Sequence, residues 1–224
     1  MYGNGVVPVR LVLKMKDGFR RLMDTYRNFA ELRQSEQEGS DFRIFHRDVD
    51  SPFAVMAPHG GGIEPGTLDI ADALAGHDFA FYAFSGTKKS GNRHLHLTSN
   101  RFDEPIGLKI AQKAAVVVAV HGNREESEVV FVGGRNTLLK KKICRALTAA
   151  GFRAEISDLP GIRGIGPENI CNRGTSGEGV QLEISRGLRE KMFEKLGRRS
   201  LRRKTHIFYE FVATIQKALL AEAC

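Results

Sequence analysis

The chain has 224 residues, of which 42% are hydrophobic and 27% are charged. This length suits one globular domain with a sizeable core, and the content of charged and aliphatic residues excludes a disordered chain. Its 34 Lys and Arg residues against 26 Asp and Glu residues give a net charge of +8. Such a surplus favours a polyanionic partner, but it does not distinguish nucleic acid, an anionic membrane and an acidic polymer.

No segment has the properties of a membrane span or of an export signal. The longest apolar run, residues 114–120, is far shorter than the roughly 20 residues that a membrane-spanning helix needs. An earlier apolar stretch, residues 6–13, is interrupted by a proline and an arginine and makes a poor signal-peptide core. The spacing of Cys144, Cys171 and Cys224 excludes a thiolate zinc site and fits reduced thiols. We therefore expect a cytoplasmic protein that reaches the outside of a cell only by lysis.

The first half of the chain predicts alternating helices and strands. Residues 25–38 predict a helix, with Asp24 as its N-cap and Gly39 as its stop. Residues 53–57 are all apolar, which is typical of a buried strand, and we expect this strand to end at Pro58. Further strands are predicted at residues 42–46, 79–84, 95–98 and 115–120, and helices at residues 67–74 and 106–113.

The second half continues the same pattern, with strands at residues 129–132 and 180–185 and helices at residues 136–150 and 205–222. Continuous apolar strands that alternate with helices predict an α/β fold with a buried sheet. We expect a single-domain three-layer sandwich in which helices flank a mixed, mostly parallel sheet. In such folds, functional sites form at the carboxyl ends of the strands.

Three residues that follow predicted strands form a candidate metal site. His59 comes directly after one buried strand and His121 directly after another, and Glu64 lies five positions beyond His59 across a glycine-rich turn. If the two strands are neighbours, the turn can fold back so that the carboxylate joins both imidazoles. Two histidines and one carboxylate leave a fourth position open for water, as in a hydrolytic zinc site. The alternative is that both histidines simply form hydrogen bonds with turns.

A second pair of histidines competes with this set. His94 and His96 alternate with leucines, so on a strand they would share one face and could chelate a metal. Only Asp103 and Glu104, in the following loop, offer a third ligand. A hydrogen bond near the wall of the pocket is the more ordinary role for either imidazole.

Glu183 is a candidate catalytic carboxylate. On the predicted strand it shares a face with Gln181, while the apolar residues point to the other face. A carboxylate in the middle of a strand is costly unless it is solvated, paired or functional. Beside a metal-bound water it would act as a general base and then as an acid. The alternative is a salt bridge to Arg186 or Arg189.

Arginines gather in the predicted loops and would suit a substrate with many carboxylates, because guanidinium groups bind carboxylates with two hydrogen bonds. The candidate substrate-binding residues are Arg135, Asn136, Arg173 and Arg186. The densest basic run, residues 198–204, is interpreted as a solvated connection into the last helix. A contact with nucleic acid is the alternative for this run.

Five sequence blocks, in this order, closely resemble the phage-type poly-γ-glutamate hydrolase family. The blocks are APHGGGIEPGT (57–67), FYAFSG (81–86), LHLTS (95–99) with FDEP (102–105), HG (121–122) and GVQLEIS (179–185). The resemblance extends over residues 25–224 and implies one hydrolase domain there, preceded by an N-terminal extension of residues 1–24. Members of this family are often labelled phage-related replication proteins.

The resemblance implies a fold similar to that of zinc carboxypeptidases and one Zn²⁺ per chain. Carried over position by position, it implies His59, Glu64 and His121 as zinc ligands and Glu183 as the catalytic carboxylate. The spacing between the first His and the Glu is four residues here and usually two in carboxypeptidases, so their substrate-binding residues are not carried over.

The resulting expectation is a monomeric zinc-dependent hydrolase that cleaves the γ-glutamyl amide bonds of poly-γ-glutamate. The net charge of +8 fits this acidic polymer and would equally fit DNA. Two alternatives stay open: a DNA-binding phage replication accessory protein, and a zinc amidase that acts on a small acylated amino acid.

Overall fold

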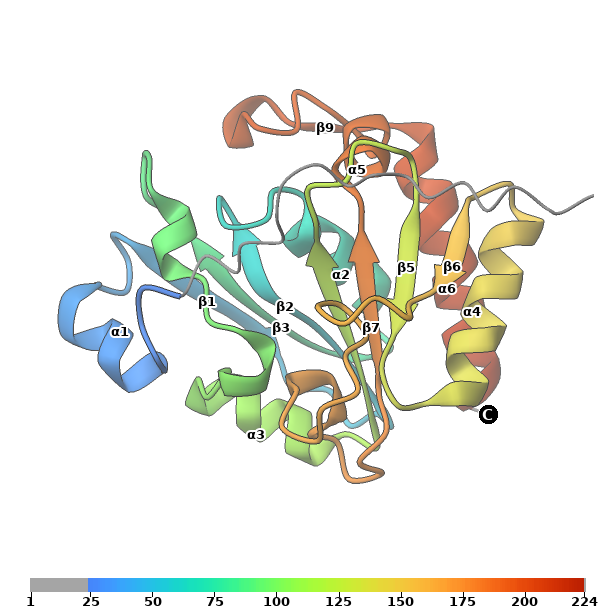
Figure 1. Cartoon of the computed structure of the whole chain (residues 1–224), viewed down its shortest axis with the longest axis horizontal. Coiled ribbons are helices and arrows are strands. Elements are labelled where there is room, and N and C mark those ends of the chain that lie inside the picture. Colours follow the sequence, from blue (N-terminus) through green and yellow to red (C-terminus); the bar gives the residue numbers. More distant parts are fainter. Residues whose placement is uncertain (1–23, 224) are drawn as a thin grey trace, which may run out of the picture.

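The computed structural model describes residues 24–223, which fold around a single seven-stranded sheet (Figure 1). Four central strands, β3, β2, β4 and β7, run parallel, while β1 and β5 pair antiparallel with β3 and β7, and β6 pairs parallel with β5. The order is β1 (Phe42–Arg47), β3 (Ala80–Gly86), β2 (Phe53–Gly61), β4 (Val116–Gly122), β7 (Val180–Ile184), β5 (Val130–Gly133) and β6 (Ala154–Ile156).

Helices cover both faces of this sheet, which confirms the predicted three-layer α/β sandwich with a mixed, mostly parallel sheet. The apolar side chains of one face pack against α2 (Thr67–Ala75), α4 (Thr137–Ala149), α5 (Arg186–Met192) and α6 (His206–Ala223). Those of the other face pack against α1 (Phe29–Ser35) and α3 (Pro105–Lys113). Because both faces are covered, every residue of β2, β3 and β7 is buried.

The expectation that the second strand ends at Pro58 is wrong. Strand β2 continues to Gly61, and its register with β3 shifts between Ala57 and Gly60. Over this stretch two residues of β2, Pro58 and His59, stand against one residue of β3, Phe84. A proline has no amide hydrogen to donate, and such an irregularity in the ladder is where a strand tolerates it.

The strand expected at residues 95–98 is absent from the described part of the chain. Two 3₁₀ helices, η1 (Asn92–Leu95) and η2 (Ser99–Arg101), occupy this region instead. Leu95 and Leu97 are buried in the core, so their alternation with polar residues reflects anchoring of a loop rather than a pleated strand.

The first helix is also shorter than expected. Asn28 caps α1 by accepting a hydrogen bond from the amide of Glu31, so Asp24 is not the N-cap. The chain leaves the helix at Glu36, before Gly39. Local helix propensity allows the longer helix, but Asp24 instead forms hydrogen bonds with His96 and Thr98, which are distant in the sequence.

Several short elements escaped the sequence pattern, since runs of two to seven residues are too short to show a clear period. They are β6, α5, η3 (Ile170–Asn172), η4 (Arg199–Leu201), and the hairpin of β8 (Phe193–Glu194) with β9 (Arg203–Lys204), which contains much of the basic run. No helix among residues 24–223 has the length and apolar character to span a membrane. Residues 1–23 of the expected extension, with the apolar stretch 6–13, and Cys224 lie outside the described residues.

Candidate metal centre

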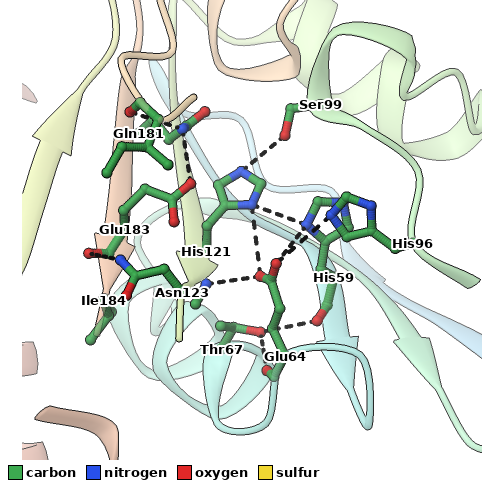
Figure 2. A network of polar contacts seen from close by, with 12 residues as sticks. His59, Glu64, Thr67, His96, Ser99, His121, Asn123, Gln181, Glu183 and Ile184 are labelled. Atoms are coloured by element: carbon green, nitrogen blue, oxygen red, sulfur yellow. Dashed lines mark hydrogen bonds and ion pairs between the residues drawn. The ribbon is translucent and has the colours of Figure 1, made fainter. Parts of the chain in front are cut away.

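The two histidines that follow predicted strands meet at the carboxyl ends of β2 and β4, which are neighbours as expected. Nδ1 of His59 lies 3.1 Å from Nδ1 of His121. Both residues are only 2% exposed. The sheet topology therefore brings together two imidazoles that are far apart in the sequence (Figure 2).

The turn after β2 brings Glu64 back to these imidazoles. The amide of Glu64 donates a hydrogen bond of 2.9 Å to the carbonyl of His59, which closes the turn. Gly61 has a φ of +67°, and a Cβ there would collide with the backbone of Gly86, so the turn requires glycine at this position. One carboxylate oxygen, Oε1, lies 3.2 Å from Nδ1 of His59, and Oε2 lies 3.8 Å from Nδ1 of His121.

Polar groups outside this cluster orient each of the three side chains. Nε2 of His59 lies 2.7 Å from the carbonyl of Leu97, which can only accept, so Nε2 carries the hydrogen and Nδ1 keeps its lone pair. Nε2 of His121 lies 3.4 Å from Oγ of Ser99. The amide of Gly122 donates to Oε2 of Glu64 at 2.8 Å. Metal-binding histidines and carboxylates characteristically have such outer partners.

The charges within the cluster favour a cation at its centre. Burial and the neighbouring His59 lower the pKa of His121 to about 3. Its imidazole is therefore neutral at pH 7 and can offer a lone pair to a metal. Burial alone would raise the pKa of Glu64, but the imidazoles, His59 above all, lower it to about 2. Burial also opposes a charge on His59, yet the Glu64 carboxylate overcomes this and raises its pKa. Positive charge is therefore stabilised between these groups.

The donor set fits a zinc ion. Ligand atoms of His59, Glu64 and His121 all lie within 4.8 Å of one another. Two nitrogens on a tetrahedral zinc would be about 3.3 Å apart, given Zn–N bonds of about 2.0–2.1 Å, which is close to the separation of the two Nδ1 atoms. Two imidazoles and one carboxylate, all buried, are also the ligand types that zinc prefers.

Glu183 stands beside this cluster on β7, where it is 8% exposed. Its Oε1 accepts a hydrogen bond of 3.0 Å from Nε2 of Gln181, whose own Oε1 accepts from Asn169. Burial raises the pKa of Glu183 well above its usual range, and the nearby Glu64 carboxylate raises it further. The structure therefore holds a buried carboxyl group that binds a proton more tightly than an exposed glutamate does.

Among residues 24–223, neither Arg186 nor Arg189 forms a salt bridge with Glu183, although the positive charge of Arg189 acts on it from a greater distance. Arg186 is exposed and pairs with Glu190 at 2.7 Å. Arg189 is buried, but its guanidinium donates to three carbonyls, those of Pro65, Asn123 and Ile184, at 2.7, 2.6 and 3.1 Å. No basic nitrogen of the described residues lies within 4.0 Å of a carboxylate oxygen of Glu183.

The competing histidine pair does not form. His94 is exposed on η1, while His96 turns inward and stacks on His59 with ring centroids 4.0 Å apart. Nε2 of His96 lies 4.0 Å from Oε1 of Glu64, outside the three-residue cluster. The difference follows from the loop conformation, since a shared face would have required a strand.

The four candidate substrate-binding residues lie apart from one another. Arg186 follows the carboxyl end of β7, whereas Asn136 caps α4 and its amide donates to Gly179 just before β7. Arg135 is exposed in the loop before that cap. Arg173 pairs with Glu168, and the residues that follow it bond to the carbonyls of residues 114 and 115, before β4 begins. The structure thus brings only Arg186 to the edge of the sheet that carries the metal cluster.

Sequence reasoning missed several groups around the centre. The Leu97 carbonyl and Ser99 lie in the misassigned loop, and Arg189 was considered only as a partner of Glu183. Gln181 did carry a signal, because it shares a strand face with Glu183.

Comparisons with known proteins identify the family of the chain. The family described as poly-gamma-glutamate hydrolase matches residues 26–214. The UPF0714 protein YndL of Bacillus subtilis (strain 168) is 35% identical over 198 residues, which cover 88% of this chain and 78% of YndL. A bacteriophage poly-gamma-glutamate hydrolase has a similar structure, with a TM-score of 0.84 and 33% identity over 89% of this chain and 98% of that one. The zinc-free apo structure of YndL gives a TM-score of 0.84 and 35% identity, and covers 90% of this chain and all of that one. Family, relatives and fold therefore agree that this hydrolase belongs to the poly-gamma-glutamate hydrolase family.

Proposed function

We propose that this protein is a zinc-dependent hydrolase that cleaves the γ-glutamyl amide bonds of poly-γ-glutamate. The observation that carries the proposal is the convergence of His59, Glu64 and His121 next to a buried carboxyl group, Glu183. A zinc-free form of the relative YndL supports the choice of zinc, and a similar bacteriophage poly-gamma-glutamate hydrolase supports the choice of substrate.

Each residue of the centre has a role that follows from its contacts. His59 and His121 would present Nδ1 to the metal, because their Nε2 atoms face Leu97 and Ser99. Glu64 would supply the third, anionic ligand. Bound there, zinc would supply Lewis-acid polarisation of an amide carbonyl and would lower the pKa of a coordinated water.

Glu183 would transfer the proton. Gln181 engages Oε1 of Glu183, so Oε2 is the oxygen available to accept a proton from the attacking water. The protonated carboxyl would then give that proton to the departing amine nitrogen. Each guanidinium nitrogen of Arg189 donates to a backbone carbonyl, so we assign this side chain a structural role, in which its positive charge also acts on the buried Glu64 and Glu183.

The polymer fits the charge of the chain. Poly-γ-glutamate carries a carboxylate on every unit, and the protein has a net charge of +8. Of the four candidate substrate-binding residues, Arg186 lies at the carboxyl end of β7, on the same edge of the sheet as the metal cluster. Substrate contacts by Arg135, Asn136 and Arg173 stay predictions.

The decisive test is to incubate the purified protein with poly-γ-glutamate, with and without a chelator, and to follow polymer length by gel filtration. We expect the polymer to shorten, the chelator to stop the reaction, and added Zn²⁺ to restore it. If the protein carries zinc but leaves the polymer intact, and instead releases amine from small acylated amino acids, poly-γ-glutamate is not its substrate. Salt-sensitive binding to duplex DNA without cleavage of the polymer would favour the nucleic-acid alternative.

A further inference from the structure

The N-terminal segment contacts the loop that lies against the metal cluster. Asp24 precedes the part of the chain that the family comparison matches, residues 26–214. Its side chain is nevertheless only 5% exposed, and it accepts three hydrogen bonds from residues more than 70 positions away. These donors are Nδ1 of His96 at 2.7 Å, the amide of Thr98 at 2.6 Å and Nη2 of Arg101 at 3.0 Å.

The loop that Asp24 holds, residues 96–99, supplies the outer contacts of both candidate histidine ligands. The ring of His96 stacks on that of His59 at 4.0 Å, and the Leu97 carbonyl accepts from Nε2 of His59 at 2.7 Å. Two positions on, Oγ of Ser99 lies 3.4 Å from Nε2 of His121. Contacts from three residues of one short loop therefore set the orientation of two imidazoles, and Figure 2 shows two of these residues, His96 and Ser99.

Apolar packing and a backbone hydrogen bond also anchor this loop. Leu95 and Leu97 are buried on the face of the sheet that α1 and α3 cover, and the amide of His96 donates to the carbonyl of Arg93. Hydrogen bonds are directional, so the carboxylate of Asp24 supplies what apolar packing does not. Burial opposes the ionisation of Asp24, but its bonds with His96 and Thr98 hold the pKa of the carboxyl well below its usual range.

We infer that Asp24 is a positioning residue of the metal centre, which acts through the 96–99 loop to hold the Nδ1 atoms of His59 and His121 toward the metal. The inference rests on the proposed zinc site. It also assigns a role in the centre to a residue that lies before the family-matched region. Outer partners of metal ligands characteristically change metal affinity by 10- to 100-fold when they are mutated.

The test measures zinc affinity rather than activity. Zinc dissociation constants are determined by competition with a chromophoric chelator for the parent protein, Asp24→Asn and Asp103→Asn. Asp103 is the matched control, because its Oδ1 accepts a similar bond of 2.7 Å from the amide of Phe29, which lies outside the 96–99 loop. We expect Asp24→Asn to weaken zinc binding about 10- to 100-fold, and Asp103→Asn to leave it unchanged.

Two results would overturn the inference: an unchanged zinc affinity in Asp24→Asn, or an equal loss in both variants, which would indicate general loosening of the N-terminal segment. If circular dichroism shows that Asp24→Asn is unfolded, His96→Phe decides the question, because it keeps a stacked ring and removes one of the three hydrogen bonds of Asp24. His96→Phe should weaken zinc binding in the same direction but by less, because Thr98 and Arg101 keep their bonds with Asp24, and an unchanged affinity again refutes the inference. A parent protein that binds no zinc would instead refute the proposed metal centre, and the role of Asp24 with it.

Discussion

His121 and Glu183 stand directly opposite each other on the neighbouring parallel strands β4 and β7. Residues paired in this way point to the same face of the sheet, so the register alone places the candidate base beside a candidate ligand. A slip of one residue would turn one of the two side chains to the opposite face. The apolar neighbours Val120 and Leu182, buried on that opposite face, hold the register.

Glu183→Gln should separate proton transfer from metal binding. The amide keeps the size of the side chain but cannot accept a proton from water, so kcat on poly-γ-glutamate should fall by roughly 10²- to 10⁴-fold, with zinc content unchanged. Steady-state kinetics and elemental analysis measure the two quantities. Glu178→Gln, at an exposed carboxylate before the same strand, is the control and should keep the parent rate. Turnover at the parent rate in Glu183→Gln would rule out Glu183 as the base.

His59→Ala should abolish zinc binding, because it removes one of three ligands and the group hydrogen-bonded to Leu97. Native mass spectrometry of the zinc-loaded proteins measures the stoichiometry. His94→Ala removes an exposed imidazole from the adjoining 3₁₀ helix and should bind zinc as the parent does. Retention of one zinc by His59→Ala would show that the metal sits elsewhere.

Arg189→Lys should destabilise the protein even though it preserves the charge. The guanidinium bonds three carbonyls, each within two residues of Glu64, His121 or Glu183, and an ammonium group cannot reach all three. The Ile184 carbonyl keeps the amide of Asn123 as a partner, so the loss falls on the partly buried carbonyls of Pro65 and Asn123. A carbonyl left without its partner costs on the order of 1 kcal/mol, so the free energy of unfolding should fall by about 1 kcal/mol in urea titrations.

Arg186→Lys is the matched control for this substitution, because Arg186 lies on the same helix with an exposed side chain. Its free energy of unfolding should change by less than about 0.5 kcal/mol. Equal stabilities of Arg189→Lys and the parent protein would mean that the three carbonyl contacts do not contribute to folding.

Cys171 should resist alkylation in the native protein. Burial raises the pKa of its thiol to about 12, so the reactive thiolate is scarce at pH 8. Iodoacetamide treatment followed by peptide mapping should label the partly exposed Cys144 before Cys171. Both should react at similar rates in urea, and rapid native labelling of Cys171 would contradict its burial.

Much of the fold follows from local patterns in the chain. Apolar runs such as the one that became β4 must be buried on both faces, which predicts a covered sheet and its helices. The predictions failed where tertiary structure overrode a local sequence preference. Pro58 sits in a register shift of β2, and the leucines near His96 anchor a loop instead of a strand.

The sequence by itself determined the α/β class, the family and the trio of His59, Glu64 and His121, because strand ends and the glycine-rich turn are local properties of the chain. Only the tertiary structure decided which groups orient that trio. The Leu97 carbonyl belongs to the backbone and leaves no trace in residue identity. Asp24 and His96 are 72 positions apart, and Arg189 bonds carbonyls from three separate segments. Such contacts arise only when the folded chain brings these atoms together, so no spacing in the sequence reveals them.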